Sequence, residues 1–181
     1  MNLEKLATQG RTKVPRSTAA SILSQQLLEM RKESLKTCFE NFFSRDHRLE
    51  TVASIHNVEF IDDSKAENVN ATWYSLESFN DSVIWIVAAN KDDSGFEKIT
   101  ELIMKKVKSI ICVGNDCSVM RGTLSGYVKT FIEASTINDA VLYAFNISRR
   151  GDKVLFSPAG LFENKTYAEA GDEFKRAVNR I

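Results

Sequence analysis

Residues 62–65, Asp-Asp-Ser-Lys, bring two carboxylates, a hydroxyl and an amine together in one short run. The residues before them, 58–61, alternate in the manner of a strand, and apolar residues three and four apart predict a helix over 68–79. The run therefore falls between the carboxyl end of a strand and the amino end of a helix, where ligands bind in open α/β sheets. A helix start suits phosphate because it offers unpaired N–H groups and a partial positive charge. Lys65 would add a full positive charge, and one of the two aspartates could hold a metal ion or a ribose hydroxyl.

The same four residues also fit a purely structural role. Aspartate and serine are preferred at helix N-caps, where their side chains accept hydrogen bonds from the first turn. Spacing alone leaves two interpretations of residues 62–65 open, a ligand-binding corner or the cap of helix 68–79.

The elements that would position this run alternate between strand and helix from His47 onwards. Near-continuous apolar runs at 82–89 and 109–113 are typical of strands buried on both faces, as in parallel sheets. The other expected strands are 49–55, 58–61, 128–132 and 154–157. The other expected helices are 96–107, a short helix within 115–127, a helix capped by Thr136 and a final helix ending at Ile181. This order predicts an α/β fold, a mostly parallel sheet flanked by helices with right-handed crossovers. Such crossovers place three loops at one edge of the sheet: 62–68, 90–95 and 158–168.

Residues 1–46 follow a different pattern. Positions 1–13 are polar and without a clear period, and two helical patterns follow at 20–30 and 35–42. We expect two short, paired helices there, so the predicted organisation is a helical appendage at 1–46 and an α/β domain at 47–181.

Composition argues against several classes of function. Twenty-four basic and 24 acidic residues cancel, so nothing suggests bulk binding of nucleic acid. Three cysteines without metal-ligand spacing and only two histidines argue against a metal site and suit a reducing compartment. The first residues lack the apolar core of a secretory signal, and no apolar run reaches the length of a membrane span. We therefore expect a cytoplasmic protein that uses no membrane.

Three familiar motifs are missing from the sequence. There is no G-x-x-x-x-G-K-[ST] loop and no G-x-G-x-x-G loop, so these 181 residues do not cradle a triphosphate in the usual ways. There is no G-x-S-x-G elbow, and Ser157 at a strand end has no histidine with an obvious route to it. The residues alone indicate an α/β domain with one polar corner that could meet a phosphate.

Four motifs in order add a family resemblance. They are His-Arg-Leu-Glu at 47–50, Phe-Ile-Asp-Asp-Ser-Lys-Ala at 60–66, Gly-Asp-Lys-Val-Leu-Phe-Ser-Pro-Ala at 151–159 and Gly-Asp-Glu-Phe at 171–174. Together they resemble the carboxyl-terminal domain of the Mur ligase family over residues 16–181. The most similar branch adds D-glutamate to UDP-N-acetylmuramoyl-L-alanine in peptidoglycan synthesis. The resemblance implies a Rossmann-like sheet that closes over ATP and Mg²⁺ on a separate P-loop domain.

The resemblance also assigns roles within the corner. Five positions match residues that bind the nucleotide: His47, Arg48, Asp63, Ser64 and Lys65. Lys65 matches the position near the transferred phosphate, where it would act catalytically by stabilising developing charge. Apart from the family, Arg48 could simply pair with Glu50 at the surface, and His47 could be a solvated or capping histidine.

The amino-acid side of the family's site is matched less well. The family's threonine that contacts D-glutamate is Glu67 here, an anion facing an anionic substrate. The family's carboxylate-binding lysine falls on Asp92, with Lys91 as a substitute one residue earlier, and Tyr167 replaces a phenylalanine. The loop after Ala159 is shorter than in the family. Glu67, Lys91 and Tyr167 are therefore predicted to line an eroded substrate pocket.

Two functions follow from this resemblance. The first is the carboxyl-terminal part of an ATP-dependent amide ligase, which contributes nucleotide and amino-acid contacts and is inactive alone for lack of the P-loop domain. Its partners would be the nucleotide and the central and amino-terminal ligase domains, which these 181 residues do not contain. The alternative is a stand-alone, degenerate module that binds a nucleotide or a protein without catalysis. The intact run 62–65 favours the first, and the altered position 67 favours the second.

Overall fold

The computed structural model describes residues 46–80, 82–92 and 94–181. The chain divides into two units, Met1–Ser44 and Arg45–Ile181, and every described residue belongs to the second. The paired helices predicted before residue 46 lie outside the described residues.

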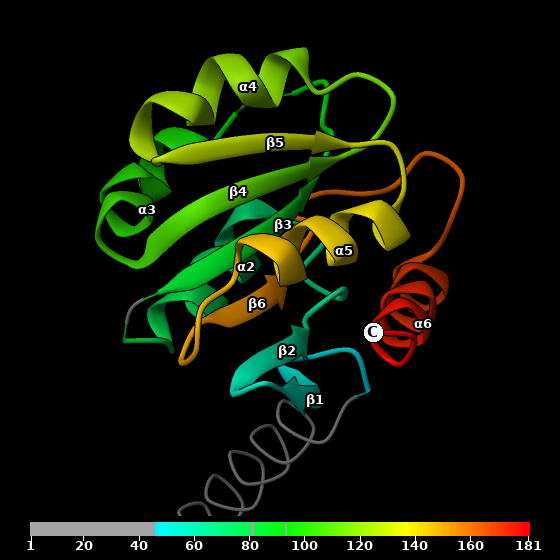
Figure 1. Cartoon of the computed structure of the whole chain (residues 1–181). Coiled ribbons are helices and arrows are strands. Elements are labelled where there is room, and N and C mark those ends of the chain that lie inside the picture. The colour runs from blue at the N-terminus through cyan, green and yellow to red at the C-terminus, as the bar shows by residue number, and fades with distance from the viewer. Residues whose placement is uncertain (1–45, 81, 93) are drawn as a thin grey trace, which may run out of the picture. The chain divides into compact units, whose positions relative to one another are not determined.

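A six-stranded sheet forms the centre of the second unit (Figure 1). Its strands run in the spatial order β1-β2-β6-β3-β4-β5. Strand β1 pairs antiparallel with β2, and every other neighbouring pair is parallel. The strands are β1 (Glu50–Ile55), β2 (Val58–Asp62), β3 (Val83–Ala88), β4 (Val107–Val113), β5 (Thr130–Ala134) and β6 (Lys153–Phe156). The prediction of an α/β fold with a mostly parallel sheet is confirmed.

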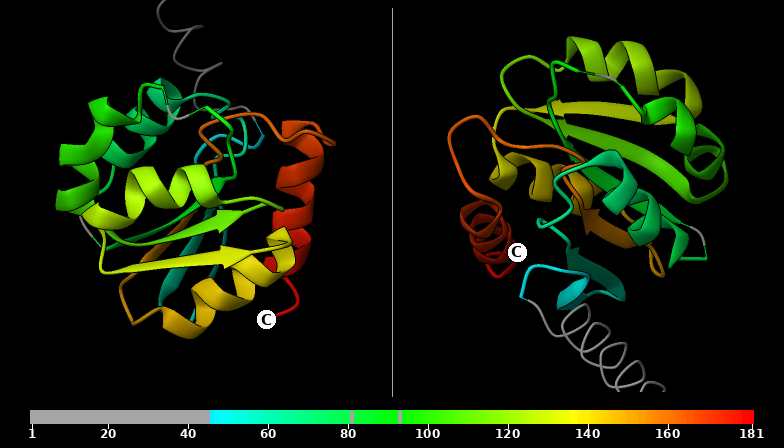
Figure 2. Two further views of the ribbon diagram at one scale, coloured as in Figure 1. Left: turned by 90° about the horizontal axis from the view of Figure 1, so that it is seen from above. Right: turned by 180° about the vertical axis from the view of Figure 1, so that it is seen from behind.

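Helices cover both faces of this sheet (Figure 2). The helices α5 and α6 pack on one face, and α2, α3 and α4 pack on the other. The helical segments are α2 (Val69–Glu77), η2 (Phe96–Ile99), α3 (Thr100–Lys106), α4 (Ser118–Leu124), η3 (Ser125–Tyr127), α5 (Ile137–Ile147) and α6 (Tyr167–Val178). No helix among the described residues is both long enough and apolar enough to span a bilayer.

Strand β3 shows why the apolar runs predict buried strands. All six of its residues are buried. Ile84 and Ile86 join the core under α5 and α6, while Trp85 and Val87 join the core on the opposite face. Successive side chains of a strand point to opposite faces, so a strand covered on both sides must be apolar throughout.

Most expected boundaries differ from the observed ones by one to three residues, and two of these differences have a clear physical cause. Val107 was expected to end a helix, but it begins β4 and pairs with Val83. The helical spacing of apolar residues includes Val107 because a buried apolar residue fits both a helix and a strand. Its pairing with β3 makes it part of the strand. The strand expected at 128–132 is β5, which spans Thr130–Ala134. It begins later because α4 continues into the short turn of η3, and Thr130 is the first residue to pair with β4.

The parallel strands β2, β6 and β3 are neighbours, so the loops after them emerge at the same edge of the sheet. This confirms the predicted meeting of the loops that follow residues 61, 89 and 157. We call this the carboxyl edge.

Candidate functional site

The run 62–65 forms a tight turn between β2 and α2. Asp63 extends the ladder, since its N–H donates to the Phe156 carbonyl at 2.8 Å, and the Ala66 N–H then closes the turn on the Asp63 carbonyl at 2.9 Å. The helix begins only at Val69, and its cap is Asn68, whose side chain accepts from the Ala71 N–H at 2.9 Å. The interpretation of residues 62–65 as the helix cap is therefore wrong.

Asp62 is fully buried and uses both carboxylate oxygens. Oδ1 accepts from the Ser64 N–H at 2.9 Å, and Oδ2 lies 2.7 Å from Nδ1 of His47. The tautomer of the His47 ring decides which of these two atoms donates, and a ring protonated on Nδ1 would donate to this carboxylate. His47 is itself buried and its ring pairs with a carboxylate, not with a helix end, so the alternative of a solvated or capping histidine is wrong.

The Asp63 side chain joins the turn to the residues that flank β1 and β6. Its Oδ2 accepts from the Ser157 hydroxyl at 2.8 Å, and its Oδ1 lies 3.4 Å from the Leu49 N–H. Ser157 in turn lies 2.8 Å from the Thr72 hydroxyl of α2. Burial raises the pKa of Asp63 from 3.8 to about 6, although the Ser157 hydrogen bond and the Arg48 charge act in the opposite direction. This carboxyl is therefore engaged inside the domain.

Arg48 stands on a bend that is fixed to the same turn. Its neighbours His47 and Leu49 both have left-handed backbone, with φ of 67° and 46°. Such conformations cost energy in residues other than glycine and persist where the surroundings hold them. The Lys65 N–H donates to the His47 carbonyl at 3.1 Å, so residues 47–50 and 62–65 form one unit, which we call the corner.

Ser64 of the corner lines a cavity of about 330 Å³, which we call the small cavity. Lys65 is half-buried, and its Nζ lies 5.3 Å from the centre of the Tyr167 ring. The Ser64 hydroxyl is buried and has no hydrogen-bond partner among the described residues. The small cavity is lined by Ser64, Glu67, Gly160, Leu161, Phe162, Lys165, Thr166 and Tyr167. The structure thus brings predicted nucleotide and substrate residues, Ser64, Glu67 and Tyr167, to one place.

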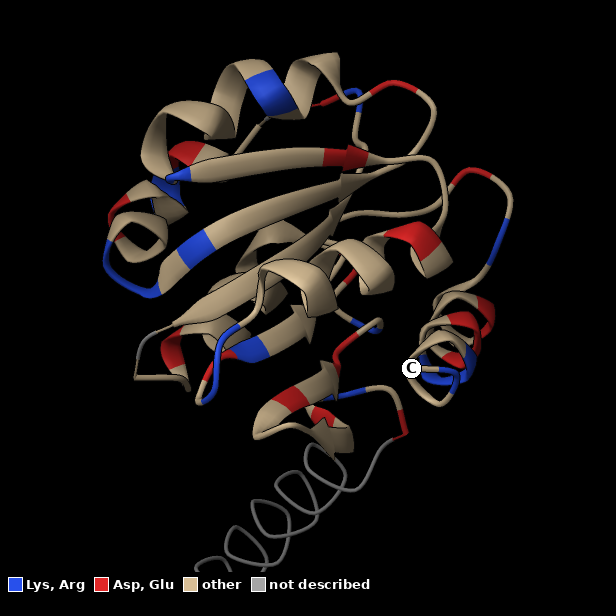
Figure 3. Cartoon of the chain, viewed as in Figure 1, with Lys and Arg blue, Asp and Glu red and all other residues tan. Residues whose placement is uncertain are grey.

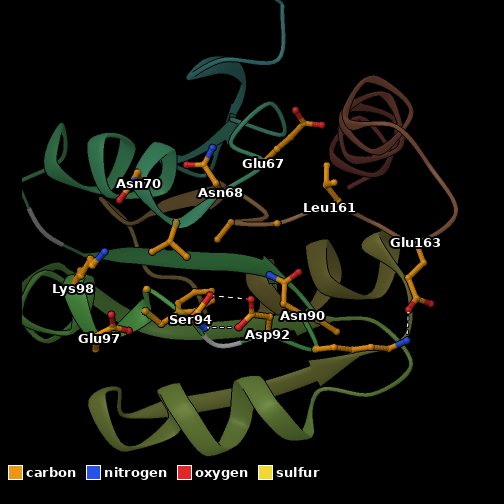
Figure 4. Close-up of a pocket in the computed structure, with 17 residues that line it drawn as sticks. Glu67, Asn68, Asn70, Asn90, Asp92, Ser94, Glu97, Lys98, Leu161 and Glu163 are labelled. Atoms are coloured by element: carbon orange, nitrogen blue, oxygen red, sulfur yellow. Dashed lines mark hydrogen bonds and ion pairs between the residues drawn. The ribbon is translucent and has the colours of Figure 1, made fainter.

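A second cavity, of about 760 Å³, opens beside the first (Figure 4). Glu67 and Leu161 lie at one end of this large cavity and Lys98 at the other. Its described lining carries four carboxylates and two amines, from Glu67, Asp92, Glu97, Glu163, Lys91 and Lys98. These side chains are exposed, and some of them pair at the surface: Lys91 pairs with Glu163 at 2.6 Å, and Asp92 accepts from Ser94 at 2.8 Å. Glu67 and Lys91, predicted substrate residues, therefore share this cavity.

His47, Glu50 and Asp62 offer atoms within 4.8 Å of one another that could ligate a metal ion. An ammonium group already lies among them, because Nζ of Lys175 is 2.6 Å from Glu50 and 3.9 Å from Asp62. This lysine therefore provides the positive charge that a cation would bring.

Sequence reasoning missed Glu50 and Lys175 as parts of the site. These two residues are 125 positions apart in the sequence, and no local pattern predicts such a pair. Gly171 was visible only through the Gly-Asp-Glu-Phe motif. A side chain there would overlap the corner, because its Cβ would lie 2.2 Å from Nδ1 of His47.

Comparison with known proteins now gives a family. The family described as "Mur ligase, glutamate ligase domain" matches residues 47–160. Two UDP-N-acetylmuramoylalanine–D-glutamate ligases are similar over most of the chain. That of Christiangramia forsetii is 39% identical, with 100% of this chain and 41% of the relative covered, and that of Porphyromonas gingivalis is 32% identical, with 88% and 36% covered. The chain thus spans about two fifths of the length of these curated relatives.

A solved structure supports the fold. A murein peptide ligase from Psychrobacter arcticus superposes with a TM-score of 0.51 over 75% of this chain and 30% of its own, at 10% sequence identity. At that identity the likeness concerns the fold alone.

Proposed function

This chain belongs to the Mur ligase family through its glutamate ligase domain, and on that premise we propose that it is the carboxyl-terminal part of an ATP-dependent amide ligase of peptidoglycan synthesis. Its relatives bear the name UDP-N-acetylmuramoylalanine–D-glutamate ligase, which makes a D-glutamate-type acceptor the first substrate to consider. The proposal includes ATP with Mg²⁺, a P-loop domain as partner, and a cytoplasmic location.

In such a reaction a substrate carboxylate attacks the terminal phosphorus of ATP, and ADP leaves. The amine of the second substrate then attacks the resulting acyl phosphate, and inorganic phosphate leaves as the amide forms. Negative charge develops on phosphate oxygens in both steps. Lys65 is half-buried beside Tyr167, and a cation in a partly desolvated place stabilises such charge more strongly than one in water. Arg48 and Lys65 would hold the phosphates, and Ser64 would donate a hydrogen bond.

One observation carries the proposal: the Ser64 hydroxyl is buried at the small cavity without a partner among the described residues. A buried hydroxyl that makes no hydrogen bond costs about 1–3 kcal/mol. Most buried polar groups are satisfied, and each exception calls for an explanation. An oxygen of a bound phosphate or carboxylate would supply the acceptor.

A second function is a stand-alone module that binds a nucleotide or protein without catalysis. The excess of carboxylates in the large cavity favours it, since an acidic lining opposes an anionic acceptor. Both functions predict that the 181 residues alone neither hydrolyse ATP nor form an amide. They differ in a chimera that supplies the P-loop and UDP-binding domains of an active relative, because only a ligase domain would restore turnover there.

Nucleotide binding by the corner is tested by titrating the 181-residue chain with MgATP and following backbone amides by NMR. We expect shifts concentrated at residues 47–50 and 62–66, with a dissociation constant of about 1 mM, since half of the usual contacts are missing. Lys65→Met should weaken binding several-fold. Lys129→Met is the matched control, because Lys129 is exposed and precedes β5 at the opposite edge of the sheet. Uniform or absent shifts at 10 mM ATP would exclude the corner as a nucleotide site.

A further inference from the structure

Helix α6 reaches the corner with one face, formed by Gly171, Asp172 and Lys175, which we call the α6 clamp. Lys175 follows Asp172 by three residues and Gly171 by four, so it neighbours both on the helix surface. The helix packs against β1 and β2, and Figure 3 shows acidic and basic residues together along it and on the segment that enters β1. The clamp lies beyond residue 160, where the family match ends.

Gly171 permits the close approach. A Cβ at this position would lie 2.2 Å from Nδ1 of His47, 2.4 Å from the Ser64 hydroxyl and 2.7 Å from Oδ2 of Asp62. Carbon atoms do not approach polar atoms so closely, so the helix can sit here only without a side chain. Glycine lowers the stability of a helix interior, and the contact with the corner accounts for its presence.

Lys175 and Asp172 add charge to this contact. Nζ of Lys175 lies 2.6 Å from Glu50 and 3.9 Å from the buried carboxylate of Asp62. The Asp172 carboxylate lies 3.7 Å from Nε2 of His47, on the side of the ring away from Asp62. The clamp therefore places a cation between two carboxylates and a carboxylate beside the imidazole.

The contacts continue from the clamp to the proposed ligand-binding groups. The His47 N–H donates to Oε2 of Glu50 at 3.0 Å, and the His47 carbonyl accepts from the Lys65 N–H at 3.1 Å. Arg48 follows His47 directly within the left-handed bend. Fixing His47 and Glu50 thus fixes the backbone that carries both Arg48 and Lys65.

We propose that the α6 clamp positions the corner for its ligand: Gly171, Asp172 and Lys175 hold His47, Glu50 and Asp62, and through them order Arg48 and Lys65 before a nucleotide phosphate arrives. The clamp residues are positioning residues, and their effect on affinity rests on the proposed function. Ordering in advance strengthens binding because the ligand need not immobilise these groups itself.

A pair of glycine substitutions separates positioning from general stability. Gly171→Ala and Gly122→Ala make the same change inside a helix, but a Cβ at Gly122 meets nothing within 4 Å. We expect Gly122→Ala to raise the melting temperature and leave MgATP affinity unchanged. Gly171→Ala should weaken MgATP binding roughly five-fold or more, measured where circular dichroism shows each variant to be folded.

A pair of lysine substitutions covers the case in which Gly171→Ala does not fold. Lys175→Met removes the charge, and Lys175→Arg should restore most of the affinity. Lys153→Met is the control, because Lys153 pairs with Glu59 at similar exposure in β6, away from the corner. Only Lys175→Met should weaken binding.

The His47 ring provides a readout without nucleotide. The chain has only two histidines, so long-range proton–nitrogen spectra resolve both, and the exposed His56 serves as an internal reference. We expect Nδ1 of His47 to be protonated in the unaltered chain, and the clamp variants to shift its ring signals and the amides of residues 62–65. Clamp variants that melt early but keep both the ring signals and the affinity would overturn the proposal. If the unaltered chain binds no MgATP while the ring responds to the clamp, the proposed function fails and the ordering of the corner by α6 stands.

Discussion

The corner and the large cavity lie at the same edge of the sheet but are built in opposite ways. In the corner, the side chains of Asp62 and His47 are 0% and 10% exposed, they pair with each other, and charged residues of the distant helix α6 lie beside them. Around the large cavity, Lys91 and Glu163 are 89% and 67% exposed, and Asp92 bonds to Ser94 two residues away. Buried, mutually bonded groups are held in one arrangement, whereas exposed groups rearrange at little cost.

This difference suits a division of labour. A phosphate-binding corner benefits from groups that are fixed before the ligand arrives. A region of exposed side chains can change its preference through single substitutions without loss of the fold, because surface changes rarely cost more than about 0.5 kcal/mol. The large cavity is therefore where we expect acceptor preference to vary.

The largest contrast should appear on removing one carboxylate from each region. Asp62→Ala leaves Nδ1 of His47 and the Ser64 N–H without their acceptor in a buried place, so we expect unfolding free energy to fall by about 2–4 kcal/mol. Asp92→Ala should leave it nearly unchanged, since Asp92 is exposed. Urea denaturation of both variants measures this. Equal losses would mean that the corner is not held by Asp62.

The next effect is the pH dependence of stability through Asp63. Burial raises its pKa from 3.8 to about 6, so the folded chain keeps a proton that the unfolded chain has already released. The stability from this group is complete below about pH 4 and is lost as the pH rises through 6, a change of about 2–3 kcal/mol. Urea denaturation of the unaltered chain and of Asp63→Asn between pH 4.5 and 7.5 isolates the contribution of this carboxyl to stability. Stability curves that stay parallel would show that Asp63 is ionised throughout.

The smallest effect concerns the large cavity. In a chimera with the missing domains of an active relative, Glu67→Thr should lower the Michaelis constant for D-glutamate, because it removes a like charge. Glu67 is exposed, so the gain should be about 1 kcal/mol, or roughly five-fold. Glu97→Thr, a change at another exposed carboxylate of the same cavity, serves as control. An identical constant for both variants would show that residue 67 does not face the acceptor.

The sequence by itself determined the layers of the domain. The apolar run of β3 predicted a strand buried on both faces, and the polar loops after β2, β3 and β6 were correctly expected at one edge. Both inferences hold because periodicity and chain direction are local properties, and parallel strands with right-handed crossovers leave few alternatives. The resemblance in four short motifs likewise led to the family.

Only the tertiary structure decided how the corner is held. In the folded chain Asn68 caps α2, and Asp62 pairs with His47. Ser157 bonds to Asp63 across 94 positions, and Lys175 bonds to Glu50 across 125. These pairs depend on β6 lying between β2 and β3 and on α6 returning over β1 and β2. Local periodicity says which face of an element is buried but not which element lies beside it, so side-chain partners from distant segments become visible only once the chain is folded.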